Sequence, residues 1–131
     1  MAPRREPSEG DETLAQDFAR KQPDAGARFA ERRSAPRFPM VADADIVEPI
    51  TRTHLSGRTA EVSVGGCYVD VQNPLPAGTV IQICIQRETG SFATWGRIAY
   101  AQQGIGMGIA FFNTVPEQAV ILREWIAGLS A

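Results

Sequence analysis

The sequence predicts a mostly β domain: a six-stranded antiparallel β-barrel with a C-terminal α-helix and a flexible N-terminal tail. Two observations predict this fold. Between residues 44 and 112, short apolar segments alternate with turn residues such as glycine, proline and asparagine, a spacing typical of β-barrels and sandwiches. Beyond residue 113, apolar side chains recur at helical intervals. A closed barrel is favoured because it removes the strand edges that such apolar segments would expose.

Residues 1–30 have the composition of a tail, and residues 31–131 form the predicted domain. The tail contains prolines and glycines among mixed charges, with few large apolar side chains. Residues 11–21 could form a short helix, because Leu14 and Phe18 share one face. A helix of this length is marginal in water on its own, so we expect the tail to be mostly disordered.

Six segments have the length and pattern of strands. Residues 79–87 give the clearest pattern, with three isoleucines on one face and two glutamines on the other, as in a half-buried strand. Turn sequences flank this segment, NPLPAG before it and ETGS after it. The other predicted strands are 44–53, 57–64, 67–71, 92–101 and 105–112.

The predicted helix begins with a capping box. Thr114 is placed to accept a hydrogen bond from the Glu117 amide, while Glu117 reaches back, and Pro116 in the first turn loses no needed donor. An apolar stripe follows at helical spacing, formed by Leu122, Trp125, Ile126 and Leu129. This stripe is expected to cover one mouth or side of the barrel, or to serve as a partner-binding face.

Composition excludes several classes of function. The net charge of −2 provides no general basic field for nucleic acid. The sequence contains no signal-like segment and no apolar run of the ~18 residues that a membrane helix needs, so we predict a cytoplasmic protein without membrane insertion. No nucleophile–base set and no Walker-type phosphate loop is present, so an enzyme is not expected.

The cysteines and the single histidine predict neither a disulfide nor a metal site. Cys67 and Cys84 both lie in apolar, strand-like segments, so we expect reduced, buried thiols. Two cysteines and His54 are too few for a metal ligand set. His54 is expected to be an exposed loop residue, and no cofactor is predicted.

Positive charge is concentrated just before the first predicted strand. Residues 28–37 contain four arginines and a single acidic residue. Arg32, Arg33 and Arg37 repel one another unless solvent or a partner compensates their charge, and Pro36 keeps the segment extended. This cluster is either a solvated linker or an anion-binding site.

A second polar motif, EVSVGG, lies at the end of a predicted strand. Glu61 and Ser63 are two residues apart and therefore share one face of the strand. Gly66 has no Cβ, so a flat ring could lie against its backbone. Taken alone, the motif is typical of an ordinary bulge or turn.

Together the two motifs resemble those of the PilZ domain family, receptors for the bacterial second messenger cyclic di-GMP. Family members carry Arg-x-x-x-Arg before a six-stranded barrel and Asp/Asn-x-Ser-x-x-Gly on an early strand, and they usually end with a helix. Residues 33–37, RSAPR, match the first motif, and Arg32 supplies the double arginine often found there. Residues 61–66 match the second motif at Ser63 and Gly66.

The resemblance covers residues 31–130, including the segment GIGMGIAFF, 104–112, which is similar to the family's glycine-rich last strand. It implies a receptor that orders its arginine loop over cyclic di-GMP and signals through contact with a protein partner not identified by the sequence. The double arginine goes with a stacked pair of ligand molecules in this family. The site that the resemblance implies consists of Arg32, Arg33, Arg37, Glu61, Ser63 and Gly66.

One residue departs from the family pattern. Glu61 occupies the position of an Asp or Asn that would meet the guanine edge. The additional methylene moves the carboxylate outward, and a good bidentate base contact is worth roughly 1–3 kcal/mol, so weaker binding is expected. The alternative is a PilZ-type adaptor that does not bind cyclic di-GMP and acts through protein contacts alone.

Trp95 is a further candidate for a stacking contact. It shares one face of its predicted strand with Arg97, so an outward-facing indole could support a second guanine. The other interpretation is a tryptophan in the core or at the rim, under the C-terminal helix.

Overall fold

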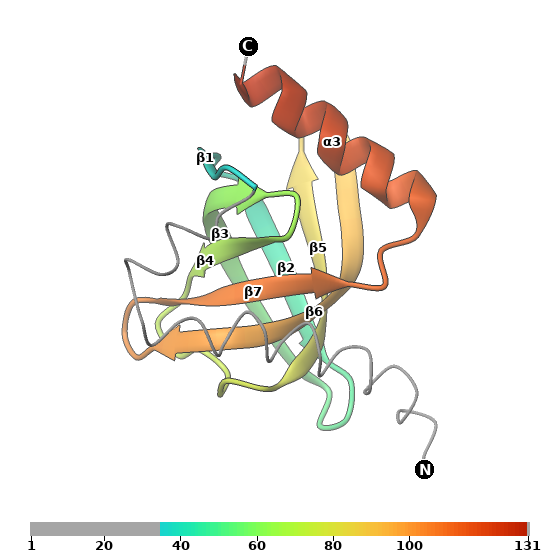
Figure 1. Cartoon of the computed structure of the whole chain (residues 1–131). Helices are drawn as coiled ribbons and strands as arrows, with labels where there is room; N and C mark the ends of the chain where they lie inside the picture. The colour runs from blue at the N-terminus through green and yellow to red at the C-terminus, as the bar shows by residue number, and fades with distance from the viewer. Residues whose placement is uncertain (1–34, 131) are drawn as a thin grey trace.

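The computed structural model describes residues 35–130, and in this part of the chain it contains seven strands and one helix. Figure 1 shows the strands wrapped around one core, with the helix across one end. The elements are β1 (Phe38–Pro39), β2 (Asp43–Glu48), β3 (Thr53–Ser63), β4 (Gly66–Asp70), β5 (Val80–Arg87), β6 (Gly90–Gln102), β7 (Gly106–Phe112) and α3 (Pro116–Ser130). The predicted tail, with its possible short helix at residues 11–21, lies outside the described part of the chain.

Six of the strands close into an antiparallel barrel, which confirms the predicted fold class. The strands follow one another in the order β3-β2-β5-β6-β7-β4, and β4 pairs with β3 to complete the ring. The seventh strand, β1, is additional and pairs with β3 beyond the end of β2. Because β1 and β2 lie along the same edge of β3, they form one line with an interruption at residues 40–42.

A buried threonine holds this interruption together. The Thr59 hydroxyl donates a hydrogen bond to the Met40 carbonyl at 2.6 Å and accepts one from the Ala42 amide at 3.0 Å. Thr59 is only 1 % exposed, so water cannot replace it as a partner for these two backbone groups. The threonine therefore holds residues 40–42, and β1 just before them, against the barrel.

The core is formed by the alternating strand residues that the sequence predicted. Ile81, Ile83 and Ile85 of β5 are buried while Gln82 and Gln86 are exposed, so this pattern is confirmed. The largest fully buried side chains of the other elements are Phe92, Ile46, Ile98, Met107, Ile109, Val62 and Val69.

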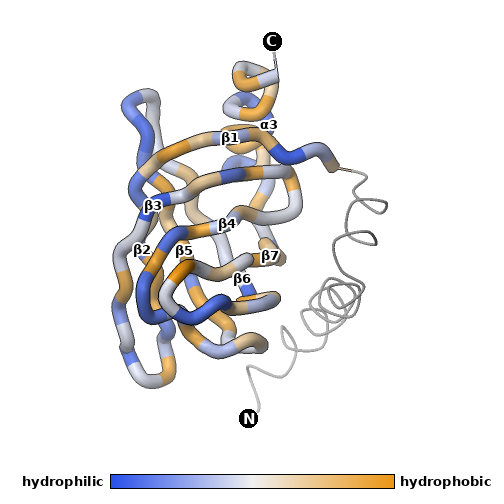
Figure 2. The backbone as a smooth tube through the Cα atoms, turned by 90° about the vertical axis from the view of Figure 1, so that its left-hand side faces the viewer, coloured by the Kyte–Doolittle hydropathy of each residue, from blue (hydrophilic) through white to orange (hydrophobic). Residues whose placement is uncertain are grey.

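Helix α3 covers one end of the barrel, as its apolar stripe predicted. Trp125 packs edge-on against Phe92 with ring centroids 6.2 Å apart, and Arg87 lies over the Trp125 ring, a cation–π contact. Leu122 and Trp125 are buried. The helix contacts β6 and β1, and Figure 2 shows β1 and α3 meeting at this end of the barrel.

The start of the helix differs from the predicted capping box. Pro116 is the first helical residue, as predicted, but the Thr114 hydroxyl shares a 2.7 Å hydrogen bond with the Thr94 hydroxyl of β6 instead of capping the Glu117 amide. Val115 accepts the first helical hydrogen bond, from the Ala119 amide. The cap prediction was wrong because a partner distant in sequence takes the threonine hydroxyl.

The first predicted strand, 44–53, was too long. The Glu48 carboxylate accepts hydrogen bonds from the Ile50 and Thr51 amides, both at 2.9 Å, and this closes a turn in which Arg52 has a φ of 66°. The chain therefore reverses after Glu48. His54 consequently lies at the start of β3 and not in a loop, although it is exposed as expected.

Candidate functional site on the outer wall of the barrel

One wall of the barrel carries a row of polar and aromatic residues on its outer face. The register aligns Glu61 of β3 with Tyr68 of β4, Tyr68 with Gly108 of β7, and Gly108 with Tyr100 of β6. Their neighbours along the strands, such as Val62, point into the core. The row therefore crosses four strands on the solvent side of the barrel, and Figure 1 shows these strands, β3, β4, β7 and β6, side by side.

Arg37, the second arginine of the first motif, reaches this row. It lies just before β1, whose Pro39 is paired with Glu61. The Arg37 Nη1 donates a hydrogen bond to Glu61 Oε1 at 3.3 Å, and the two side chains are 25 % and 46 % exposed. A partly exposed ion pair of this kind is worth at most about 1 kcal/mol, so an anionic ligand could displace the carboxylate.

Tyr100 brings a hydroxyl to the same arginine. Its ring lies across Gly108, where an added Cβ would come within 2.5 Å of ring atoms, and its hydroxyl lies close enough to Arg37 for the guanidinium to lower its pKa. Burial raises the pKa of Tyr100, and the charge and hydrogen bond of Arg37 oppose this increase. The guanidinium thus contacts groups from two strands, Glu61 of β3 and Tyr100 of β6.

Tyr68 is placed over Gly106 of β7 in the same way as Tyr100 is placed over Gly108. Its ring lies over Gly106, where an added Cβ would be 2.7 Å from Cε2, and its hydroxyl donates a hydrogen bond to Gln102. The centroids of Tyr68 and Tyr100 are 6.1 Å apart and the rings are tilted by 32°. The glycine-rich last strand therefore provides space for two aromatic rings next to Arg37.

Neither tyrosine was among the predicted site residues. If the alternation of Trp95 and Arg97 continued, residue 99 would face solvent and Tyr100 the core. A bulge between Ile98 and Tyr100 shifts this alternation by one residue and turns Tyr100 outward. Alternation alone does not reveal a bulge. The glycines at alternate positions of β7 were a usable signal, because they indicate close approach of another group.

Ser63 and Gly66 of the second motif lie on either side of the turn between β3 and β4, at the end of one strand and the start of the next. The Ser63 hydroxyl accepts a hydrogen bond from the Gly65 amide at 3.1 Å and donates a long one to the Gly66 carbonyl at 3.5 Å. A Cβ on Gly66 would lie 2.1 Å from the Ile109 carbonyl oxygen of β7. The glycine therefore has a packing role in barrel closure, whatever its role toward a ligand.

The structure brings together part of the predicted site. Arg37 and Glu61 are in contact, Ser63 follows Glu61 at the end of β3, and Gly66 begins β4. Arg32 and Arg33 lie outside the described residues.

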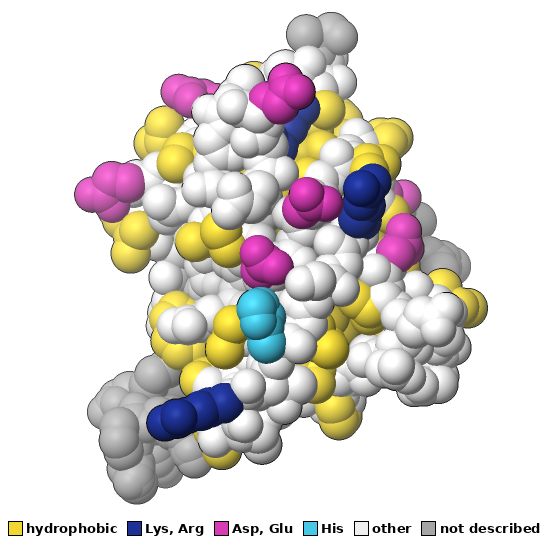
Figure 3. Space-filling view, turned by 180° about the vertical axis from the view of Figure 1, so that it is seen from behind, with side chains coloured by type: hydrophobic (Ala, Val, Ile, Leu, Met, Phe, Trp, Pro, Cys, Tyr) yellow, Lys and Arg dark blue, Asp and Glu magenta, His cyan; other side chains and the backbone are white. Residues whose placement is uncertain are grey.

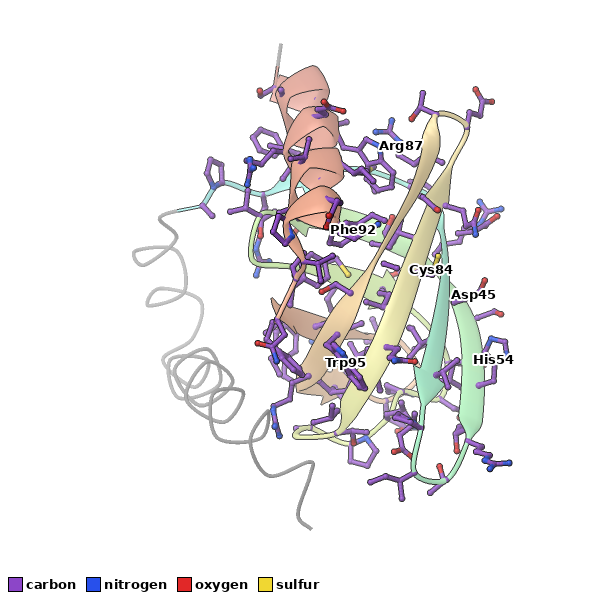
Figure 4. The ribbon with its side chains drawn as sticks, turned by 90° about the vertical axis from the view of Figure 1, so that its right-hand side faces the viewer. Asp45, His54, Cys84, Arg87, Phe92 and Trp95 are labelled. Atoms are coloured by element: carbon purple, nitrogen blue, oxygen red, sulfur yellow. The ribbon has the colours of Figure 1, made fainter. Side chains whose placement is uncertain are left out.

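Trp95 lies elsewhere on the barrel. The indole stacks against Phe112 with centroids 6.2 Å apart and an interplanar angle of 24°. Figure 4 shows it on β6, well below α3, so Trp95 does not pack under the helix. Trp95 is half-buried, which agrees with a place at the rim.

The opposite wall carries a separate polar group. His54 Nε2 lies 3.8 Å from Asp45 Oδ1, and the Ser56 hydroxyl donates to the same oxygen at 3.2 Å. Cys84 is nearby on β5 (Figure 4), and Figure 3 shows the histidine in the open on the rear surface. Within residues 35–130, no group of three His, Cys, Asp or Glu side chains is placed to hold a metal ion.

The cysteines are free thiols, as predicted, but only one is buried. Cys67 of β4 is 8 % exposed, and burial raises its pKa to about 12. Cys84 is half-buried. In the described part of the chain, no helix is long and apolar enough to span a membrane.

Comparison with known families decides what this barrel is. The profile of the PilZ domain matches residues 31–128. The chain belongs to the PilZ domain family. The match includes both arginine positions of the first motif and the whole barrel, and it confirms the resemblance inferred from the motifs. No curated protein matches the chain at a significant level.

Solved PilZ structures share the fold at low sequence identity. The PilZ domain of CeSA from a cellulose-synthesizing bacterium is 21 % identical, with a TM-score of 0.60 over 73 % of this chain and 99 % of that one. The PilZ domain of YcgR from Escherichia coli, solved with c-di-GMP, is 16 % identical, with a TM-score of 0.62 over 76 % and 92 %.

A complex of MrkH with c-di-GMP from K. pneumonia is 13 % identical, with a TM-score of 0.66. It covers 76 % of this chain but only 52 % of MrkH, so this PilZ chain corresponds to about half of that protein. At these identities the similarity establishes the PilZ fold of the chain.

Proposed function

We propose that this PilZ domain is a cyclic di-GMP receptor that orders its arginine loop over the ligand and signals through contact with another protein. The observation that carries the proposal is the position of Arg37 on the outer wall beside Glu61 and Tyr100. Membership of the PilZ family and the c-di-GMP complexes of YcgR and MrkH support it. The proposed ligand residues are Arg32, Arg33, Arg37, Glu61, Ser63 and Gly66.

The chemistry of the ligand suits these side chains. Cyclic di-GMP presents two phosphates and two guanines, and a guanidinium can bind phosphate oxygens in a fork, bind guanine O6 and N7, and stack on a purine. Arg33 and Arg37 can span up to roughly 13 Å of extended chain, enough to approach a ligand of this size from two sides.

A surface that changes on binding has to lie near the loop. β1 follows the arginine loop directly and contacts α3, so ordering of the loop alters the surroundings of both elements. The proposed partner surface therefore includes the loop, β1 and the adjoining part of α3.

Calorimetric titration with cyclic di-GMP tests the receptor function, with cyclic di-AMP and GTP as ligand controls. The wild type is compared with the double variant Arg33→Ala/Arg37→Ala. The matched control is Arg52→Ala/Arg123→Ala, which removes the same charge at two exposed positions. Binding that is lost in the first variant and kept in the second supports the proposal, and the stoichiometry distinguishes one ligand molecule from a stacked pair.

A wild type that gives no heat at high micromolar ligand would refute the receptor function. The same result is expected if the protein is instead a PilZ adaptor that does not bind cyclic di-GMP. The existing Arg37–Glu61 ion pair favours this second candidate, because a phosphate has to displace the carboxylate. If Glu61→Asp then binds the ligand, the additional methylene of Glu61 is what disables the site.

A further inference from the structure

The Arg37 guanidinium lies at the meeting point of groups that come from opposite sides of the wall. Glu61 belongs to β3 and Tyr100 to β6, and β4 and β7 lie between them. Neighbouring strands are about 4.8 Å apart, so the two backbones are separated by roughly 14 Å across three such steps. A contact between these positions therefore needs side chains that lie flat along the wall.

Gly108 makes this contact possible. An added Cβ at this position would be 2.5 Å from Cε2 and Cζ of Tyr100 and 2.9 Å from its hydroxyl oxygen. The phenol therefore occupies the space over β7 where any other residue would place a side chain. Because the ring lies across β7, its hydroxyl extends away from β6, toward the side from which Arg37 approaches.

The two partners of Arg37 have different chemistry. Glu61 accepts a charge-assisted hydrogen bond but is 46 % exposed, so solvent weakens its hold. Tyr100 is half-buried, and burial raises the pKa of its hydroxyl while Arg37 counteracts the increase. A neutral hydroxyl also does not compete with a phosphate for the charge of the guanidinium, so it can stay beside Arg37 when an anion replaces Glu61.

We propose that Tyr100 is a positioning residue of the site, whose hydroxyl, carried over Gly108, holds the Arg37 guanidinium on the outer wall in the orientation that meets an anionic ligand. This inference rests on the proposed function, because it assigns a role within the same cyclic di-GMP site. It also explains the glycine at position 108 of β7, because any side chain there would occupy the space of the Tyr100 ring. Tyr100 acts through Arg37 and need not touch the ligand.

A double-mutant cycle tests the coupling. Cyclic di-GMP affinity is measured by calorimetry for the wild type, Tyr100→Phe, Arg37→Ala and the double variant. Tyr100→Phe keeps the ring over Gly108 and removes only the hydroxyl, and we expect about tenfold weaker binding, which corresponds to about 1.4 kcal/mol. In the Arg37→Ala background the same substitution should change the affinity by less than about twofold, because its target is absent.

Tyr68→Phe is the matched control. It removes the hydroxyl of the neighbouring ring, whose hydrogen bond goes to Gln102 and not to Arg37, and should leave the affinity within about twofold of the wild type. If Tyr100→Phe weakens binding equally with and without Arg37, the hydroxyl acts on the ligand or on the fold, and the proposal is overturned. An unchanged affinity for Tyr100→Phe in the wild-type background overturns it as well.

A second measurement needs no ligand. The chain has only two tyrosines, so the ¹³Cζ signals of tyrosine-labelled protein can be followed separately through a high-pH NMR titration. Because Arg37 lowers the pKa of Tyr100, Arg37→Ala should raise that pKa more than it changes the pKa of Tyr68, which burial, Tyr100 and Asp70 raise. A Tyr100 pKa that does not respond shows that the contact is absent in solution and overturns the proposal, whatever the ligand result.

The two failures can be told apart. If the wild type does not bind cyclic di-GMP, the proposed function fails, and the NMR titration still decides whether Tyr100 holds Arg37. If the wild type binds but the cycle shows no coupling, the receptor function stands and the role of Tyr100 fails. A lower thermal stability of Tyr100→Phe does not change either conclusion, because the cycle compares the effect of the same substitution on affinity with and without Arg37.

Discussion

Gly66 is the position where a single methyl group should have the largest effect on this barrel. In Gly66→Ala, the new Cβ would lie 2.1 Å from the Ile109 carbonyl oxygen and 3.2 Å from its carbonyl carbon. These are backbone atoms of β7, which cannot rotate away as a flexible side chain can. The substitution therefore has to separate β4 from β7 at the point where Gly66 pairs with Ala110.

The expected cost follows from this geometry. Relief of the contact requires the strands to move apart by about 1 Å, and overpacking of this kind costs about 1–3 kcal/mol. The nearby hydrogen bond from the Phe111 amide to the Gly65 carbonyl, 2.9 Å long, would be strained or lost at about 1 kcal/mol. We expect a total loss of about 3 kcal/mol, a large share of the 5–15 kcal/mol typical of a domain.

Urea denaturation measures this loss, and Gly65→Ala is the matched control. Nothing lies within 4 Å of a Cβ built on Gly65, so that variant should stay within about 0.5 kcal/mol of the wild type. With an m-value of about 1–3 kcal/mol/M, the midpoint of Gly66→Ala should fall by at least about 1 M. Equal urea midpoints for the two alanine variants would refute a role of Gly66 in barrel closure, so that only a role in ligand binding would remain for it.

Three further predictions concern buried groups. A thiol reagent at pH 8 should label Cys84 readily and Cys67 only after unfolding, because Cys67 is buried and its pKa is raised to about 12. Above pH 9 the unfolded thiol ionises while the folded one stays protonated, so Cys67 should lower the free energy of unfolding by roughly 1 kcal/mol per pH unit up to about pH 12. Thr59→Val should cost about 2–5 kcal/mol in urea denaturation, because it leaves the Met40 carbonyl and Ala42 amide buried without a partner.

Each of these has a control. Rapid labelling of both cysteines in the folded protein would contradict the burial of Cys67. The alkaline slope should become smaller in Cys67→Ala and persist in Cys84→Ala, and the opposite pattern would assign it to the wrong thiol. Thr59→Ser keeps the hydroxyl and should recover most of the stability lost in Thr59→Val; if both variants lose the same amount, the methyl group and not the hydrogen bonds is responsible.

The fold could be predicted because its signals are local and repeated. The alternation of Ile81, Ile83 and Ile85 with polar residues needs only the two-residue period of a strand. The predictions that failed depend on distant partners: Thr114 was expected to cap the helix, but its hydroxyl meets Thr94, twenty residues earlier. No local pattern indicates which of two available partners a hydroxyl will take.

The candidate site was predicted only as far as its sequence motifs extend. Arg37 and Glu61 were identified from their motifs, and the structure places them in contact. Tyr100 was missed because the bulge after Ile98 reverses the side on which later residues emerge. The roles of the six predicted ligand residues stay predictions until a ligand titration is made.

The short strand β1 has a consequence for aggregation. In the part of the chain that the structure describes, the six barrel strands have neighbours on both sides, and β1 alone forms a sheet edge. That edge is two residues long, and one of them is Pro39, which has no amide hydrogen to offer an incoming strand. A second chain therefore finds almost no template for edge-to-edge pairing, so the folded protein should remain dispersed at concentrations where chains with longer exposed edges assemble into fibres.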